Sequence, residues 1–272
     1  LKRWGYAPLR AAVRATTRRA AAIIATDRSI VPFAERHLRP KTGQLITIPN
    51  GIDLVDMGAL AGPAEGQLLR QRHGIAADDT VLLSVGRLEH NKGFDLLAQA
   101  LGRAARPGGP LAGLGWRWVL AGAGPYRAAI QAVVEAEGLG PHVLFAGRVS
   151  DADLHAWYEA ATVFVHPSRY EGSSLVTLEA MAHRRAIIAT RAGGLPDKVR
   201  PGVNGWLVDV DSVDGLTRAI EEAADARGSL QAMGAASRRI VEEEFSWTVL
   251  VESYLTAYAA LSARSALQPD GR

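Results

Sequence analysis

Apolar residues gather in short, nearly continuous runs that alternate with longer segments of helical period. Runs of this kind, rich in β-branched residues or leucine, are typical of strands buried on both faces. We expect eight strands, at Ala22–Ala25, Leu45–Ile48, Thr80–Val85, Arg117–Ala121, Val143–Ala146, Thr162–Val165, Ala186–Thr190 and Gly205–Val208. Because helical segments separate the strands, the pattern predicts an α/β protein with a doubly wound parallel sheet.

The helical segments and turn signals also suggest a division of the chain. Turn-forming residues at Pro49–Asp53 follow a strand and precede a less regular stretch, so we expect a domain linker there. Residues 1–48 and 49–245 should form separate units, residues 246–264 a final helix, and residues 265–272 a frayed tail. Helices are expected over Ala7–Ala20, Ser29–Leu38, Gly66–His73, Gly93–Ala104, Pro125–Gly138, Ser150–Ala160, Ser174–Ala182, Val213–Ala226, Ser229–Phe245 and Trp247–Ser262.

Composition narrows the class of protein. With 272 residues, of which 48% are hydrophobic, the chain can bury a sizeable core, and it lacks the apolar run that a membrane-spanning helix requires. The absence of cysteine excludes disulfide scaffolds and thiolate metal sites, and we expect a cytoplasmic protein. Because the sequence starts with Leu1 rather than methionine, we expect it to be part of a longer protein.

Positive charge is concentrated at the front of the chain. The net charge is +3, whereas residues 1–26 alone carry six cations, with no acidic residue before Asp27. A basic helical face of this kind suits either solvent or an anionic membrane surface, so peripheral membrane contact is one expectation. The cations are Lys2, Arg3, Arg10, Arg14, Arg18 and Arg19.

The first motif with chemical meaning is VGRLEHNKG, residues 85–93. A strand ends at Gly86, which permits close backbone approach, and Arg87 and Lys92 follow five positions apart. The guanidinium and the ammonium can converge on one polyanion such as a diphosphate. The alternative is that both are solvated surface cations near a turn.

The second motif is EGSSLVTLEAMA, residues 171–182, after the strand that ends at Val165. The amides of Gly172, Ser173 and Ser174 lie at the expected start of a helix, where backbone N–H groups favour phosphate. Glu171 should lie in the loop and Glu179 farther along the helix. Carboxylates beside a phosphate site are suited to accept the vicinal hydroxyls of a sugar or a ribose.

Each of these carboxylates also has a purely structural interpretation. Glu171 could stabilise the helix N-terminus through its charge. Glu179 could be a surface residue, although its apolar neighbours leave little polar face around it, which favours a partner for the carboxylate. His166 follows a strand at the expected crevice and could contact the donor, but a lone histidine beside Pro167 is more often a structural hydrogen bonder, which is the interpretation we favour.

Together the two motifs resemble those of the retaining glycosyltransferases of family 4, which have the two-domain GT-B fold. The resemblance covers roughly residues 20–260 and includes the segments 48–53, 120–125, 145–149, 192–197 and 204–208. It implies that residues 49–245 are the Rossmann-like donor domain, that residues 1–48 are a remnant of the N-terminal acceptor domain, and that the final helix crosses back to that domain.

The resemblance also implies roles for individual residues. Arg87 and Lys92 would hold the donor diphosphate and stabilise the leaving group, Glu171 would contact the transferred sugar, and Glu179 would bind the ribose hydroxyls. The backbone around Val149 would contact the base. Where the family often has an aromatic residue and a glycine after Glu-Gly, this chain has Ser173 and Ser174, so the hexose is not fixed. The base also stays open, and the donor is expected to be UDP- or GDP-linked. The expected catalytic residues are Arg87, Lys92 and Glu171, and the expected donor-binding residues are Gly86, Arg87, Lys92, Val149, Glu171, Gly172, Ser173, Ser174, Leu175 and Glu179.

The sequence therefore predicts a retaining hexosyltransferase that uses a nucleotide-diphosphate sugar, needs no other cofactor and acts on a carbohydrate or lipid-linked acceptor. With most of the acceptor domain absent, the chain alone is expected to bind nucleotide but to transfer sugar poorly. No histidine pair stands at metal-ligand spacing, and the tryptophans fall inside predicted elements, so neither a metal nor a nucleic-acid partner is expected.

Two alternatives from other classes stay open. One is a non-catalytic nucleotide-binding module. The other is a dinucleotide oxidoreductase, suggested by Gly122-Ala123-Gly124, although Arg127 stands where that fingerprint requires a third glycine.

Overall fold

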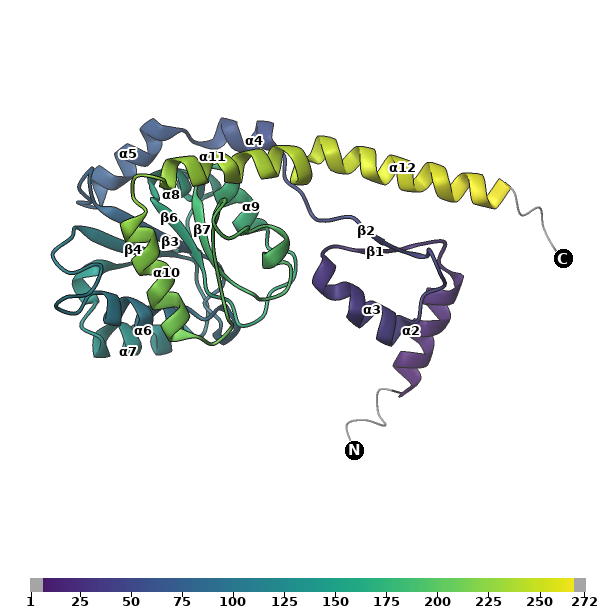
Figure 1. Ribbon diagram of the computed structural model, residues 1–272, viewed down its shortest axis with the longest axis horizontal. Coiled ribbons are helices and arrows are strands. Elements are labelled where there is room, and N and C mark those ends of the chain that lie inside the picture. The colour runs from purple at the N-terminus through teal and green to yellow at the C-terminus, as the bar shows by residue number, and fades with distance from the viewer. Residues whose placement is uncertain (1–6, 267–272) are drawn as a thin grey trace.

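The computed structural model describes residues 7–266 and contains a six-stranded parallel sheet with helices on both faces (Figure 1). The strand order is β5-β4-β3-β6-β7-β8, with every neighbouring pair parallel. This is the predicted doubly wound α/β architecture. The strands are β3 (Thr80–Val85), β4 (Trp116–Ala121), β5 (Val143–Gly147), β6 (Val163–His166), β7 (Ala186–Thr190) and β8 (Gly205–Val208).

The strand order fixes where a ligand site can form. From β3 the chain adds β4 and β5 on one side, and it then returns to place β6, β7 and β8 on the other. The direction of winding therefore reverses between β3 and β6, and in such sheets the crevice at the carboxyl ends of the two strands is the usual ligand site.

Each face of the sheet has its own apolar core. One core packs α5 (Pro63–Arg72), α8 (Asp151–Ala160), α9 (Leu175–Ala182) and α11 (Leu230–Ile240) against the sheet. The opposite core packs α6 (Phe94–Ala104), α7 (Arg127–Ala136) and α10 (Val213–Asp225) against the sheet, and α6 and α7 lie at its lower edge in Figure 1. Alternate residues of β3 belong to opposite cores, which explains why this strand is a continuous apolar run rather than an alternating one.

A smaller unit precedes the large sheet. It contains α2 (Ala7–Arg19), β1 (Ile23–Ala25), α3 (Val31–Leu38) and β2 (Leu45–Thr47), with β1 and β2 paired in parallel. Its contact with the larger unit includes a hydrogen bond from the Arg28 amide to Asp197 Oδ2 at 2.8 Å.

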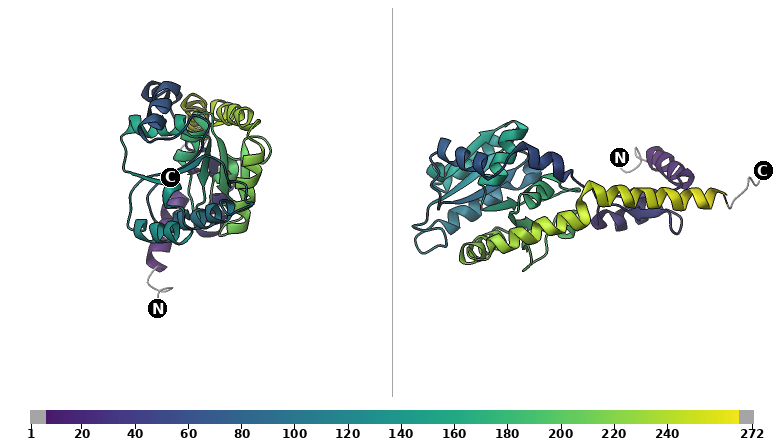
Figure 2. Two further views of the ribbon diagram at one scale, coloured as in Figure 1. Left: turned by 90° about the vertical axis from the view of Figure 1, so that its left-hand side faces the viewer. Right: turned by 90° about the horizontal axis from the view of Figure 1, so that it is seen from above.

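The segment between the two units is held against the start of the last helix. Ile52 exchanges backbone hydrogen bonds of 3.0 Å with Phe245 and Trp247, and the Trp247 indole donates to Gly51 O at 3.2 Å. From this point α12 (Trp247–Ala266) extends away from the large sheet, towards the side on which α2 and α3 lie (Figures 1 and 2).

All eight predicted strands are present to within two residues at their ends, whereas several helix predictions were wrong in detail. The less regular stretch expected after Asp53 is a helix, α4 (Leu54–Leu60), because the Asp53 carboxylate accepts hydrogen bonds from the first-turn amides of Val55 and Asp56. The segment Ser29–Leu38 is divided into a 3-10 turn, η1 (Arg28–Ile30), and α3.

Two further differences concern the end of the chain. The helix expected over Ser229–Phe245 changes at Val241 into a π-helical turn, η5 (Val241–Phe245). Helix α12 continues to Ala266, so the first two residues of the expected tail are helical, and residues 267–272 lie outside the described part.

Candidate functional site

Lys92 and Glu171 meet where the direction of winding reverses. Lys92 ends the 3-10 turn η2 (His90–Lys92) that follows β3, and Glu171 lies in the loop between β6 and α9. Lys92 Nζ is 2.7 Å from Glu171 Oε2, and both side chains are at least 85% buried. The predicted cation and carboxylate are therefore brought together at the carboxyl ends of β3 and β6.

Close backbone contacts hold the two loops in place. Gly93 adopts a left-handed conformation, with φ of 67°, and a Cβ atom there would overlap the carbonyl oxygen of Pro167. The amide of Arg169 donates to Asn91 O at 2.8 Å. The Arg169 guanidinium also makes a two-pronged ion pair with Asp95, at 2.7 and 2.8 Å. Sequence reasoning missed this tie, because the two residues are far apart along the chain.

The Glu171 carboxylate is held unequally at its two oxygens. Oε2 lies 2.6 Å from His166 Nε2, 2.7 Å from Lys92 Nζ and 3.3 Å from Ser168 Oγ. Oε1 accepts only from the Gly172 amide, at 3.2 Å, among the residues described. Oε2 is therefore saturated, and Oε1 keeps acceptor capacity for a hydroxyl group.

The environment keeps Glu171 ionised. Burial by itself would raise its pKa, but the hydrogen bond from His166, together with the hydrogen bond and charge of Lys92, outweighs burial and lowers the pKa to about 2. Burial lowers the pKa of His166, so we assign this ring as neutral. Its Nε2 atom carries the proton and donates a hydrogen bond to the ionised Glu171. His166 is thus the structural hydrogen bonder that the sequence suggested, and its target is a candidate site residue. Within residues 7–266 its Nδ1 atom has no hydrogen-bond partner.

Arg87 does not join the pair of Lys92 and Glu171. Its guanidinium forms an ion pair with Glu89 at 2.8 Å, and the side chain is 76% exposed. Arg87, Gly86 and Val149 line a cavity of about 220 Å³ at the carboxyl ends of β3 and β4, which Leu154 of α8 borders. Three of the predicted donor-binding residues therefore share one cavity.

The start of α9 continues the site. Ser174 is the N-cap residue, and its hydroxyl accepts from the Thr177 amide at 3.4 Å. The amides of the first helical residues, starting with Leu175, have no acceptor inside the helix, which makes this end a favourable place for negative charge. Gly172 is exposed and Ser173 half-buried.

Lys198 is a second buried cation that sequence reasoning missed. It is fully buried, and its ammonium lies 3.4 Å from Ser173 Oγ and 3.3 Å from Gly194 O. Burial lowers its pKa, while the charges of Asp197, Asp27 and Glu171 oppose that shift. In the sequence it stands in a loop with no feature that distinguishes it from a surface lysine.

Glu179 faces α8 from within α9. Its Oε2 atom accepts a hydrogen bond of 2.7 Å from the hydroxyl of Tyr158, which is fully buried. Burial raises the pKa of Glu179, and the hydrogen bond from Tyr158 opposes that rise. Glu179 is therefore a largely buried, partnered carboxylate rather than a surface residue of the helix.

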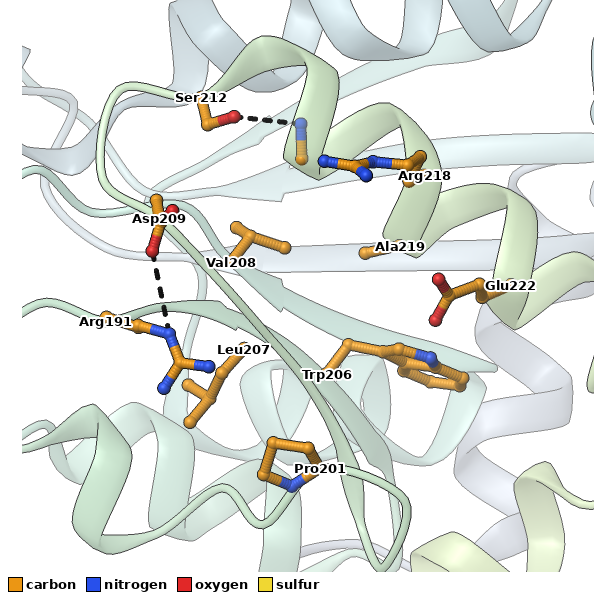
Figure 3. A pocket seen from close by; sticks show the side chains of 11 residues that line it. Arg191, Pro201, Trp206, Leu207, Val208, Asp209, Ser212, Arg218, Ala219 and Glu222 are labelled. Atoms are coloured by element: carbon orange, nitrogen blue, oxygen red, sulfur yellow. Dashed lines mark hydrogen bonds and ion pairs between the residues drawn. The ribbon is translucent and has the colours of Figure 1, made fainter.

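A different hollow, of about 330 Å³, lies between β8 and α10 (Figure 3). Trp206, Arg218 and Glu222 line it, and Arg191 forms an ion pair of 3.6 Å with Asp209 at its rim. None of the predicted site residues lines this hollow, although it is larger than the cavity at Arg87.

Two further observations apply to residues 7–266. They contain no group of three or more histidine, aspartate or glutamate side chains arranged to hold a metal ion. Nor does this part of the chain contain a helix with the length and apolar character needed to span a bilayer.

The sheet and its site define the class of the protein as a doubly wound Rossmann-like fold, with a buried cation and a carboxylate where the winding reverses. The chain belongs to the family described as glycosyl transferases group 1, whose sequence profile matches residues 66–240. This confirms the resemblance to family 4 glycosyltransferases.

Individual relatives agree with this membership. The chain is 32% identical over 241 residues to a GDP-mannose-dependent alpha-(1-6)-phosphatidylinositol monomannoside mannosyltransferase of Mycolicibacterium smegmatis. The aligned region covers 82% of this chain and 60% of that protein. It superimposes on sucrose-phosphate synthase from Thermosynechococcus elongatus with a TM-score of 0.77 and 29% identity, covering 92% of this chain and 61% of that one.

The fold also matches that of Anabaena HepE in complex with UDP-glucose, with a TM-score of 0.78, 22% identity and coverage of 93% and 67% of the two chains. The match covers 60% of the length of the Mycolicibacterium protein and 49% of that of a second relative with the same printed name, from Mycobacterium tuberculosis.

Proposed function

We propose that this chain binds a nucleotide-diphosphate sugar at the carboxyl ends of β3 and β6 and forms the donor side of a retaining hexosyltransferase. The observation that carries the proposal is the contact of Lys92 with Glu171 at the reversal of winding, next to the N-terminus of α9. A cation, helix amides and hydroxyl-accepting carboxylates are the groups that a diphosphate-linked sugar requires.

In this proposal Lys92, Arg87 and the first amides of α9 bind the diphosphate. Breaking the sugar–phosphate bond places negative charge on the departing diphosphate, and preorganised cationic and N–H groups stabilise that charge. Arg87 would leave Glu89 and turn towards the phosphates. Gly86 and Gly172 permit close approach of the backbone, Ser173, Ser174 and Leu175 complete the phosphate side, and the backbone of Val149 contacts the base.

Glu171 would accept a hydroxyl of the transferred hexose through Oε1. With a pKa of about 2 and Oε2 already saturated, it is a weak base and a hindered nucleophile. This supports attack on the same face of the sugar, with the leaving phosphate helping to remove the acceptor proton, over a covalent glycosyl-enzyme. Glu179 would accept the ribose hydroxyls.

We infer GDP-mannose as the first donor to test, because four of the curated relatives are named GDP-mannose-dependent mannosyltransferases. The first of these names also contains a phosphatidylinositol acceptor, which supports a lipid-linked acceptor here. The basic face of α2, with Arg10, Arg18 and Arg19 exposed, would then rest on an anionic membrane at the inner, cytoplasmic surface.

A thermal-shift panel of nucleotide sugars tests the proposed ligand. A ligand at one hundred times its dissociation constant stabilises the folded state by about 2.7 kcal/mol. We expect GDP-mannose, or a UDP-hexose if the base preference differs, to raise the melting temperature, and nicotinamide dinucleotides to leave it unchanged. A response to the dinucleotides alone would overturn the proposal.

Contact with membranes has a separate test. Binding to vesicles that contain anionic phospholipid should be detectable at low ionic strength and should weaken at high salt, because the attraction is screened. Binding that is equally strong to neutral vesicles, or that does not respond to salt, would contradict a role for the basic face.

A further inference from the structure

We propose that Tyr158 is a positioning residue that holds the Glu179 carboxylate in the orientation that accepts the ribose hydroxyls of the bound nucleotide. The inference rests on the proposed function, because Glu179 has this role only if a nucleotide binds here. Tyr158 lies outside both sequence motifs, on α8, whose Leu154 borders the cavity at Arg87.

The hydrogen bonds of Tyr158 leave one oxygen of the carboxylate available. The Tyr158 hydroxyl lies 2.7 Å from Glu179 Oε2 and 3.3 Å from Val176 O. A hydroxyl carries one hydrogen, so the shorter contact is the principal bond. Among residues 7–266 Tyr158 is the hydrogen-bond donor to Glu179, and Oε1 keeps its acceptor capacity.

The phenol ring cannot swing away from this carboxylate. It stacks on His183, with ring centroids 5.5 Å apart and an interplanar angle of 11°, and also contacts the rings of His155 and Phe164. His183 is fixed in turn, because its Nδ1 lies 2.7 Å from Glu159 Oε1 and its Nε2 lies 2.7 Å from His155 Nδ1. A hydrogen-bond donor whose ring is held by packing in this way fixes the geometry of the carboxylate that it contacts.

The charges around Glu179 explain why the hydrogen bond from Tyr158 matters. Burial raises the pKa of Glu179, and Asp151, at the start of α8, raises it further. The hydrogen bond from Tyr158 and the charge of His183, at the end of α9, oppose the rise. Only the ionised carboxylate accepts from both ribose hydroxyls. Removal of the Tyr158 hydroxyl should raise the pKa of Glu179 further, so that nucleotide binding is lost at a higher pH as the solution is acidified.

The test uses the nucleoside diphosphate whose sugar raises the melting temperature in the thermal-shift panel, written here as GDP, and its 2′,3′-dideoxy analogue. Each is titrated by calorimetry into the wild-type chain, Tyr158→Phe and Glu179→Gln. In Tyr158→Phe we expect the affinity for GDP to fall about two- to tenfold, as for one lost hydrogen bond, and the affinity for the dideoxy nucleotide to change less than twofold. The low-pH limb of GDP binding should move to higher pH. Tyr258→Phe, an exposed residue of α12, is the matched control and should behave as the wild type.

The outcomes separate this inference from the proposed function. If neither nucleotide binds the wild type, or if Glu179→Gln leaves the preference for GDP unchanged, the proposed ribose site is wrong. If the wild type prefers GDP through Glu179 but Tyr158→Phe keeps the same preference and pH profile, the positioning role is wrong. Equal losses for both nucleotides would mean that Tyr158 only supports packing, which also overturns the role.

Folding does not confound the comparison. Phenylalanine keeps the shape of the buried ring, and both ligands are measured on one preparation. A partly unfolded preparation would reduce the number of binding sites equally for both nucleotides and leave the affinity ratio unchanged.

Discussion

At the scale of single residues, the site depends on how the charge of Glu171 is held. Three donors converge on one oxygen of this buried carboxylate, and one of them, Lys92, is a cation. Removing one partner of a buried ion pair leaves the other charge uncompensated, which costs far more than losing an exposed pair. The same arrangement that would bind a donor therefore also contributes to the stability of the fold.

Lys92→Met should lower the free energy of unfolding by about 2–4 kcal/mol at pH 7, because Glu171 remains buried and loses its cation. The folded-state pKa of Glu171, about 2, lies below its ordinary value of 4.5, so its contribution to stability is fully present above pH 4.5 and disappears as the pH falls towards 2. The difference between the variant and the wild type should shrink over that range. Urea denaturation at pH 7 and at pH 3 measures both effects.

Arg103→Met is the matched control for this change. Arg103 is 45% exposed and pairs with Asp214, which is 80% exposed, so its loss should change stability by less than about 1 kcal/mol. A Lys92→Met variant that resembled this control at pH 7 would contradict the account of Glu171.

Sequence reasoning at this scale found the residues whose position follows from strand ends. Lys92 and Glu171 follow neighbouring strands, so parallel pairing brings them together, whereas Arg87 is paired with Glu89 instead of converging with Lys92. Tyr158 lies 21 residues before Glu179, and only the folded structure shows that their side chains meet. Nothing in the pattern distinguishes this tyrosine from other buried aromatic residues.

At the scale of elements, the turn after β3 and the start of α9 determine the shape of the site. The turn approaches the loop after β6 so closely at Gly93 that no side chain fits. Helix α9 begins directly after Ser174, its N-cap residue, which follows the loop that carries Glu171. Both features are local, and both can be tested by single substitutions.

Gly93→Ala should destabilise the fold by more than Gly74→Ala. Both glycines have positive φ, 67° and 63°, for which a Cβ atom costs about 1–2 kcal/mol. At Gly74 there is open space, whereas at Gly93 the new atom would meet Pro167 O, so the loops must separate. Thermal unfolding of the two variants measures the difference, and equal melting temperatures would contradict the close approach.

Ser174→Ala should cost about 1 kcal/mol, because it removes the side-chain cap of α9. Ser229→Ala is the control, because Ser229 precedes α11 without a side-chain bond to that helix and should have an effect of less than about 0.5 kcal/mol. Chemical denaturation of both variants provides the values. A larger loss at Ser229 would refute the capping assignment.

The strands were predictable because burial on both faces leaves a clear apolar signature in each of them. The start, end and type of some helices were harder to predict. Helix α4 has seven residues and depends on the cap at Asp53, a residue that the sequence pattern places equally well in a turn. The π-helical turn at Val241–Phe245 has no signature in apolar periodicity, because it continues the helix α11 without a break.

At the scale of the whole molecule, the chain spans about 50 to 60% of the length of its first curated relatives. Its small N-terminal unit touches the large one at the loop after β7, where the Arg28 amide contacts Asp197. In the proposed function, residues of the large unit form the donor side of the site.

The 272-residue chain should therefore bind a nucleotide sugar but release nucleotide slowly or not at all when a glycolipid acceptor is added. Release of GDP or UDP can be followed by a coupled assay alongside direct binding. Rapid and acceptor-dependent transfer by this chain alone would show that the acceptor side is already complete.

The most direct test of the central claim is calorimetric titration of GDP-mannose, with UDP-glucose in parallel, into the wild-type chain, Lys92→Met, Glu179→Gln and Arg103→Met. We expect the wild type to bind one of the two nucleotide sugars and Arg103→Met to bind that ligand with the same affinity as the wild type. In Lys92→Met and in Glu179→Gln the affinity for that ligand should fall at least about tenfold, as expected when a charged hydrogen-bond partner is removed. Unchanged affinity in both site variants would show that the nucleotide sugar does not bind where β3 and β6 end.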